Sequence, residues 1–365
     1  MNSIKTLLIS SILVVVSTAL TISLLEIGLR LFDGSDGWSE TSKANIIRNR
    51  VFEYDLNGLY PSESNKVTYV RNEYGLRDNC SNPSEISILS MGGSTTDQRY
   101  VEFDSTYQSV IQKTLRDKIS NFGCVTNAGV DGHSTWGHLF AFENWFSLIP
   151  EMSPKYVLLY VGINDAYFSR TSSPTYGYDN LDRDSFKGWL KQFRIVQRLL
   201  PIYQLIMQIN TNRNTVYGGH MPSKFSLQDY SVSTLHPDTK SLTLKNSSAF
   251  RDRMVKILSY IEDMGAKPIC VTQPHRYVIE IDGELRGIDN MLGEGFSGLD
   301  YDYSIRALNN VMLELCNDYY LDLYSQSYKE NHFYDGAHTT AKGSIYIGNL
   351  MADFIIAKYS LEPYN

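Results

Sequence analysis

Short apolar segments alternate with longer amphipathic segments from residue 86 almost to the C-terminus, and no other feature of the sequence constrains the fold as strongly. The run "YVLLYV" at 156–161 is apolar throughout, which is typical of a strand buried on both faces of a parallel sheet. Four further strands are predicted at 86–91, 124–130, 267–271 and 320–325, with helices at 104–119, 136–146, 249–264, 303–316 and 341–358. This alternation predicts a three-layer α/β/α fold around a roughly five-stranded parallel sheet.

Composition and charge exclude several classes of protein. The chain of 365 residues is 42% hydrophobic and 20% charged, which is a globular composition and not a disordered one. Its net charge of −7 argues against a general nucleic-acid-binding protein, because such proteins are usually basic. The four cysteines show no C-x-x-C spacing, which excludes a common zinc signature.

The N-terminal segment is long and apolar enough to cross a membrane. Residues 6–25 carry no charge, and a helix of this length spans about 30 Å, the thickness of the hydrocarbon core of a bilayer. Lys5 precedes the segment and acidic residues follow it, so the positive-inside rule predicts a cytoplasmic N-terminus and export of the remainder. We expect an uncleaved anchor. The alternatives are a signal peptide cleaved after the small residues Ser17 and Ala19, and a buried helix of a soluble protein.

The chain divides into three predicted regions. Residues 1–33 form the anchor or signal segment, residues 34–84 form a linker and an irregular lead-in, and residues 85–365 form the α/β domain. Within that domain the polar stretch 166–248 breaks the alternation of strands and helices. We expect it to be an insertion that shapes access to a site.

One helix is predicted inside the insertion, at about 185–208. Basic side chains recur along one of its faces, at Lys187, Lys191, Arg194 and Arg198. We expect a solvated face on an ordinary packed helix, and contact with an anionic membrane surface is the alternative.

Polar residues follow four of the predicted strands. Ser94 comes after the first strand behind a glycine pair, and "NAGVDGHST" at 127–135 continues from the second. Asn164, in "VGINDA", follows the third strand, while Asp335 and His338, in "YDGAH", come about ten residues after the fifth. Ligands of parallel α/β sheets bind beyond the carboxyl ends of the strands, so we expect these residues to meet at one edge of the sheet.

Together these residues supply the groups that acyl transfer requires. The Ser94 hydroxyl becomes a good nucleophile only when a base such as His338 removes its proton. Asp335 is placed to accept a hydrogen bond from the other imidazole nitrogen and to stabilise the imidazolium. The oxyanion that forms needs donors, which the Ser94 N–H, the Gly132 N–H and the Asn164 amide can provide.

The four blocks resemble those of the SGNH hydrolases, also called GDSL esterases, which are named after a Ser, a Gly, an Asn and a His in separate blocks. The matching segments are Gly92-Gly93-Ser94 for G-D-S, Asn127 to Gly132 for N-x-x-x-x-G, Gly162-Ile163-Asn164-Asp165 for G-x-N-D and Asp335 to His338 for D-x-x-H. With the insertion set aside, the resemblance covers residues 86–358. It implies a flavodoxin-like SGNH fold with Ser94 as nucleophile and with Gly132 and Asn164 as oxyanion donors.

The sequence departs from the family pattern at one position. Gly93 stands where the family usually has Asp, which leaves the proposed chemistry intact and the subfamily open. Thr96 occupies the position of the second glycine in G-x-S-x-G, which argues against the nucleophile elbow of the α/β-hydrolases.

Other residues near the blocks are expected to be structural. We expect Gly129 to be a backbone-bend residue, and Arg77 and Asp78 to be a structural pair that ties the lead-in to the core. The remaining aromatic and histidine side chains are expected to pack in the core or on the surface, with pocket lining as the alternative: His133, His138, Tyr167, Phe168 and His275.

The cysteines divide into two groups. Cys80 precedes the first strand and Cys124 begins the second, so an exported protein is expected to join them in a disulfide. Cys270 and Cys316 are expected to be buried thiols.

The sequence thus predicts a membrane-anchored serine esterase on the periplasmic or extracellular face, with secretion after signal cleavage as the alternative. The resemblance implies a small-molecule, glycan or lipid ester as substrate, and the extracytoplasmic setting and the aromatic, hydroxyl-rich insertion favour O-acetyl carbohydrate. The membrane is the other expected partner, and the expected reaction needs no metal or cofactor. An extracytoplasmic O-acyltransferase using the same residues and a catalytically silent envelope-assembly protein are the alternative functions.

Overall fold

The computed structural model describes residues 2–32, 37–41, 44–61, 65–168, 193–196, 198–199, 225–289, 291 and 295–360. A five-stranded parallel sheet forms its centre, built from β3 (Ile86–Gly92), β4 (Cys124–Asn127), β5 (Tyr156–Tyr160), β7 (Lys267–Val271) and β10 (Tyr320–Leu321). The strands lie in the order β10-β7-β5-β3-β4, and every neighbouring pair is parallel. Counted along the chain this is the order 2-1-3-4-5 of flavodoxin-like folds. The predicted fold class is confirmed, although β10 is shorter than expected.

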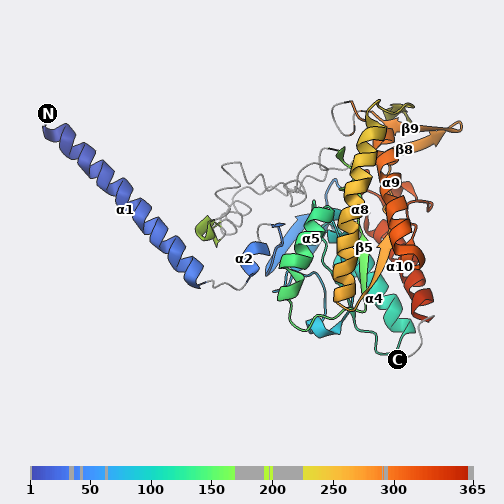
Figure 1. The fold of residues 1–365 in the computed structure, drawn as a ribbon, viewed down its shortest axis with the longest axis horizontal. Coiled ribbons are helices and arrows are strands. Elements are labelled where there is room, and N and C mark those ends of the chain that lie inside the picture. The colour runs from blue at the N-terminus through green and yellow to red at the C-terminus, as the bar shows by residue number, and fades with distance from the viewer. Residues whose placement is uncertain are drawn as a thin grey trace.

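Helices cover both faces of this sheet (Figure 1). The helices α4 (Tyr107–Lys118) and α10 (Ala341–Ser360) pack on one face, and α5 (Thr135–Asn144), α8 (Thr239–Asp263) and α9 (Gly298–Cys316) pack on the other.

Successive residues of β5 enter the two opposite cores. Val157 and Leu159 join the core beneath α5, α8 and α9, while Tyr156 and Leu158 join the core beneath α4 and α10. All four are almost completely buried, which explains why this strand shows no alternation of polar and apolar residues.

The predicted irregular lead-in contains regular structure. After the short helix α2 (Trp38–Thr41), the strands β1 (Arg50–Asp55) and β2 (Lys66–Arg71) form an antiparallel pair. Alternate residues of β2 are buried, but they include Tyr69 and Arg71 beside Val67. Polar residues on the buried face hide the strand periodicity, and the prediction of irregular structure is therefore wrong for these two strands.

A second small sheet was also not predicted. It consists of β6 (Tyr230–Val232), β8 (Val278–Ile281) and β9 (Glu284–Ile288), paired antiparallel in the order β6-β9-β8. Asp282 and Gly283 connect β8 to β9 with φ values of 53° and 80°. An Asp-Gly pair between short apolar segments is a strong hairpin signal, so the hairpin of β8 and β9 could have been predicted from the sequence.

The end of the predicted insertion belongs to the core. The helix α8 begins at Thr239, so residues 239–248 continue a helix that was expected to start at 249. The predicted helix at 185–208 and its basic face lie almost entirely outside the described residues, so both stay predictions.

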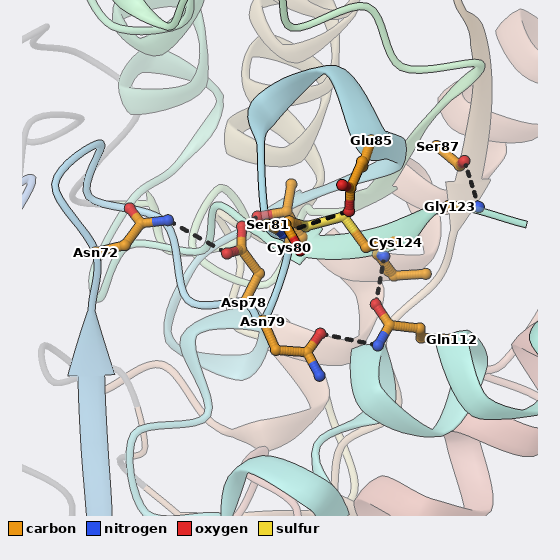
Figure 2. The surroundings of a disulfide bond; sticks show 12 residues. Asn72, Asp78, Asn79, Cys80, Ser81, Glu85, Ser87, Gln112, Gly123 and Cys124 are labelled. Carbon is orange, nitrogen blue, oxygen red and sulfur yellow. Dashed lines mark hydrogen bonds between the residues drawn. A yellow bond between two sulfur atoms is a disulfide. The ribbon is translucent and has the colours of Figure 1, made fainter.

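Two disulfides join segments of the core. The predicted bond between Cys80 and Cys124 is confirmed, with a Cα–Cα distance of 5.8 Å. Figure 2 shows that hydrogen bonds surround it, including one from Asn72 to Asp78. The Gln112 side chain of α4 bonds both Asn79 and the backbone N–H of the residue after Cys124. These contacts fix the chain before β3 against the start of β4.

The second disulfide corrects a prediction. Cys270 of β7 and Cys316 at the end of α9 form a disulfide with a Cα–Cα distance of 6.1 Å, whereas buried thiols were expected. The two residues lie 46 positions apart in the sequence, and only the packing of α9 on the sheet brings them together. No free cysteine remains in the chain.

The N-terminal helix α1 (Asn2–Phe32) projects away from the sheet (Figure 1). Its segment Ile9–Leu31 has a mean hydropathy of 2.2 and only 6% of it is buried, so it is long and apolar enough to cross a membrane. A signal sequence near the N-terminus also meets these criteria of length and composition.

Candidate active site

The turn after β3 brings the Ser94 hydroxyl to the carboxyl edge of the sheet. The strand ends at Gly92, and the one-turn helix α3 (Ser94–Asp97) begins two residues later. A Cβ atom on Gly92 would collide with the Thr96 side chain and with the carbonyl oxygen of Tyr160. A Cβ on Gly93 would lie 2.5 Å from the Asn164 Nδ2 atom. The glycine pair is therefore required by close approach on both sides of the turn.

A chain of hydrogen bonds runs from Ser94 to Asp335. The Ser94 Oγ atom lies 2.7 Å from His338 Nε2, and His338 Nδ1 lies 2.7 Å from Asp335 Oδ2. The other carboxylate oxygen, Oδ1, accepts hydrogen bonds from the backbone N–H groups of Ala337 and His338, at 2.8 and 2.7 Å. The carboxylate thus holds both the imidazole and the loop that carries it.

The electrostatic environment favours the ion pair between His338 and Asp335. Burial alone would lower the pKa of His338, but the charge and the hydrogen bond of Asp335 raise it above its ordinary value. Burial raises the pKa of the Asp335 carboxyl, and the opposing effects of His338 and of the two backbone N–H groups bring it below its usual range. Asp335 is therefore ionised at neutral pH and stabilises the protonated imidazole.

The two residues predicted as oxyanion donors, Gly132 and Asn164, lie in the loops after β4 and β5. Gly132 has a φ of +82°, a conformation that favours glycine. The Asn164 side chain lies next to Gly93, and its Nδ2 atom donates a hydrogen bond to the His133 carbonyl at 2.9 Å. This bond ties the loop of Asn164 to the loop of Gly132.

A buried charge network holds the loop of Asn164, and sequence analysis did not identify it. Asp165 accepts hydrogen bonds from the Thr135 N–H and hydroxyl, at 3.1 and 2.5 Å, and lies 3.3 Å from Arg253 Nη2. Arg253, from α8, also donates to the Thr135 hydroxyl. Asn246 of the same helix donates to the Asp165 carbonyl at 2.6 Å. Only Asp165 could have been noticed from the sequence, because it belongs to the G-x-N-D block.

A second buried network joins the hairpin to the end of α3. Asp97 is 1% exposed and forms ion pairs with Arg71 of β2 and with Arg99, the latter at 2.9 Å. Tyr69 donates a hydrogen bond to the same carboxylate at 2.5 Å, and Arg99 also pairs with Asp131 at 3.0 Å. Burial raises the pKa of Asp97, but the two arginines bring it below its usual range.

Aromatic side chains lie against the imidazole. The Tyr334 ring stacks on His338 with a centroid distance of 5.6 Å, and Tyr60 stacks on Tyr334 at 5.7 Å. Tyr60 is partly exposed, so the stack leads from the imidazole towards the surface.

The residues that were expected to have structural roles are packed inside the protein. Gly129 lies so close to the backbone of α3 that a Cβ atom would collide with it. His133 is buried with Nε2 2.9 Å from the Ala44 carbonyl. His138 is buried as well, and burial holds its pKa well below the ordinary value.

Three further side chains were expected to pack or to line a pocket. His275 has a fully buried side chain and lies 3.2 Å from Asp302, so it is a core residue. Tyr167 and Phe168 are partly exposed and pack against the rings of Tyr301 and Phe296.

Arg77 and Asp78 connect the lead-in to the core, but through separate partners. Arg77 donates to the carbonyls of Gln98 and Val101 at 2.7 Å, and Asp78 bonds Thr126 and Asn72. The expectation that these two residues tie the lead-in to the core is therefore confirmed.

Comparisons with known proteins give only distant similarities. No family model matches the sequence, and no curated protein matches it. Among solved structures, an acetylxylan esterase from Geobacillus stearothermophilus is similar over 73% of this chain and 93% of its own, at 14% identity and a TM-score of 0.40. A putative G-D-S-L family lipolytic protein from Desulfitobacterium hafniense is similar over 73% and 98%, at 12% identity and a TM-score of 0.38. Similarities this low do not assign an activity to this chain.

Proposed function

We propose that this chain is a serine ester hydrolase of the SGNH type, with Ser94 as nucleophile, His338 as general base and Asp335 as the group that orients the imidazole. The observation that supports this most directly is the unbroken chain of two 2.7 Å contacts from the Ser94 hydroxyl through the imidazole to the Asp335 carboxylate. The turn after β3 and the loop after β10 bring together three side chains in the arrangement that activates a serine in unrelated hydrolases.

The reaction follows from the positions of these groups. His338 Nε2 removes the proton of Ser94 as Oγ attacks the ester carbonyl, and the oxyanion accepts hydrogen bonds from the N–H groups of Ser94 and Gly132 and from the Asn164 amide. The imidazolium then gives its proton to the departing alcohol, which leaves an acyl-serine. Water, deprotonated by the same nitrogen, attacks this intermediate and releases the carboxylic acid.

We propose an O-acylated carbohydrate as the substrate. The support is the stack of Tyr60 and Tyr334 on His338, which extends an aromatic surface away from the reacting atoms. Tyrosine combines a flat apolar face with a hydroxyl group and so suits a ligand that has both kinds of surface.

We further propose that the enzymatic domain lies on the extracytoplasmic side of a membrane, held by α1. The two disulfides support this location, because disulfides persist mainly in oxidising compartments. The apolar helix supports attachment to a membrane or passage through one.

The test uses the full chain in detergent. We expect a fluorophosphonate probe to label Ser94 and the protein to hydrolyse p-nitrophenyl acetate and acetylated xylan. Ser94→Ala should abolish both, whereas Ser109→Ala on α4 should leave both unchanged. Failure of the wild-type protein to react with the probe, together with no hydrolysis of either ester, would refute the proposal.

The same residues would catalyse acyl transfer if a sugar hydroxyl replaced water. Adding an oligosaccharide acceptor in excess distinguishes the two reactions. A hydrolase releases the acid in nearly the same amount with and without the acceptor, and a transferase forms the acylated sugar instead.

A further inference from the structure

The loop after β7 carries none of the residues proposed above, although β7 lies directly beside β5 in the sheet. Gln273 lies two residues beyond the end of this strand and is 1% exposed. It is uncharged and belongs to none of the four sequence blocks. Its two side-chain contacts, however, both lead into the candidate site.

One side of the Gln273 amide contacts the loop of the nucleophile. Its Nε2 atom donates a hydrogen bond to the Thr95 hydroxyl at 2.5 Å, and Thr95 directly follows Ser94. The other side contacts the loop of the oxyanion donor, because Oε1 accepts a hydrogen bond at 2.8 Å from the N–H of Ile163, which directly precedes Asn164.

The segment around Ile163 is fixed at both of its backbone groups. Its N–H bonds Gln273, and its carbonyl accepts a hydrogen bond from the Tyr301 hydroxyl of α9 at 2.7 Å. Thr95 and Gln273 are both buried, so water does not readily replace either partner.

We propose that Gln273 is a positioning residue that sets the distance between the Ser94 hydroxyl and the Asn164 amide, and this inference rests on the proposed function. The nucleophile and the oxyanion donor come from separate strands, β3 and β5, and the amide of Gln273 bridges the residues next to them. A displacement of about 1 Å between such groups can reduce the rate about 10²-fold. The amide therefore acts on the rate through Thr95 and Ile163 without touching the substrate.

A purely structural glutamine in the core would behave differently. Loss of its hydrogen bonds would lower stability and leave the turnover of the folded protein unchanged. Thr272, the neighbouring residue, provides a matched control, because its buried hydroxyl contacts Asp322 and the Tyr324 N–H, both at 2.8 Å and both in the loop after β10.

The experiment compares Gln273→Met, Thr95→Val and the double variant with Thr272→Val, using the full chain in detergent. Gln273→Met keeps the length of the side chain without its amide, and Thr95→Val keeps the shape without the hydroxyl. We expect each to lower kcat for p-nitrophenyl acetate roughly 10-fold to 100-fold with little change in KM, and to slow fluorophosphonate labelling of Ser94 similarly. Thr95→Ser should restore kcat, and Thr272→Val should lower the melting temperature while kcat stays at the wild-type level.

Two further measurements separate positioning from a direct effect on the base. The pH midpoint of kcat/KM should be the same in wild type and in the Gln273 variant, because His338 and Asp335 are untouched. The double variant should lose little more than Gln273→Met alone, since both changes remove the same contact.

The outcomes are distinct. If Gln273→Met does not fold, Thr95→Val decides the question by itself. A wild-type protein that is labelled and active, combined with variants whose kcat equals that of Thr272→Val, overturns the inference and leaves the proposed function standing. A wild-type protein that is neither labelled nor active overturns the proposed function, and the inference with it.

Discussion

Replacing Arg71 with Met tests whether the hairpin of β1 and β2 is part of the folded domain. The Arg71 side chain is 4% exposed and donates hydrogen bonds to the carbonyls of Gly75, Asn127 and Gly129, in addition to its ion pair with Asp97. These acceptors belong to the chain after β2, to the last residue of β4 and to the loop that follows it. One guanidinium therefore ties the hairpin to the block that contains Gly132.

The expected loss of stability depends on which hydrogen bonds the partners of Arg71 retain after the substitution. Asp97 keeps Arg99 and Tyr69, and the Asn127 carbonyl keeps the Arg77 N–H at 3.0 Å. The carbonyls of Gly75 and Gly129 lose their arginine donor. A buried acceptor without a partner costs about 1–3 kcal/mol, so Arg71→Met should lower the free energy of unfolding by about 2–6 kcal/mol.

The assay is thermal unfolding of the full chain in detergent. A domain of about 300 residues has an unfolding entropy of about 0.6 kcal/mol/K, so the expected loss is about 3–10 °C in melting temperature. Arg50→Met is the matched control, because Arg50 lies directly opposite Arg71 in the hairpin and is partly exposed. We expect it to change the stability by no more than about 0.5 kcal/mol. Equal melting temperatures of the two variants would refute the idea that Arg71 joins the hairpin to the core.

Three other predictions concern the candidate site and the second disulfide. Asp335→Asn should lower kcat by about 10⁴-fold with little loss of stability, and a loss below about 10-fold in steady-state kinetics would contradict the proposed role. Since only neutral His338 can act as a base and its pKa is raised, kcat/KM should fall as the pH drops, with a midpoint above about 6.5. A pH–rate profile with a midpoint below that value would contradict the Asp335 contact. Joint replacement of Cys270 and Cys316 by Ser should cost about 4 kcal/mol for a loop of 46 residues, or about 7 °C in melting temperature. An unchanged melting temperature, or free thiols at both positions in the wild-type protein, would count against this bond.

Much of the central sheet could be predicted from local patterns. β5 is apolar throughout because both of its faces are buried, and the helix α4 has a buried stripe that includes Ile111 and Leu115. The hairpin of β1 and β2 could not be predicted in this way. Its buried face holds Arg71 and Tyr69, whose polar groups are satisfied by partners elsewhere in the chain. Apolar periodicity cannot reveal a strand that buries charge.

Local sequence patterns also fail to reveal the residues that hold the loops of the site in place. Arg253 lies in the middle of a long helix and Gln273 follows a strand, and neither position has a local pattern that sets it apart from other polar residues. Each is recognisable only by its partners, among them Thr135 for Arg253 and Thr95 for Gln273, which are 118 and 178 positions away in the chain.

The sequence by itself determined the order of the strands of the central sheet and of the helices that cover it, and the placement of Ser94, Asn164 and His338 after strands, because hydrophobic periodicity and turn residues act over short distances. Only the tertiary structure decided which polar side chains share a buried hydrogen bond and which cysteines form the second disulfide. Those contacts arise from the parallel arrangement of the strands and from the packing of helices across them, and a parallel sheet joins residues that are far apart in the chain.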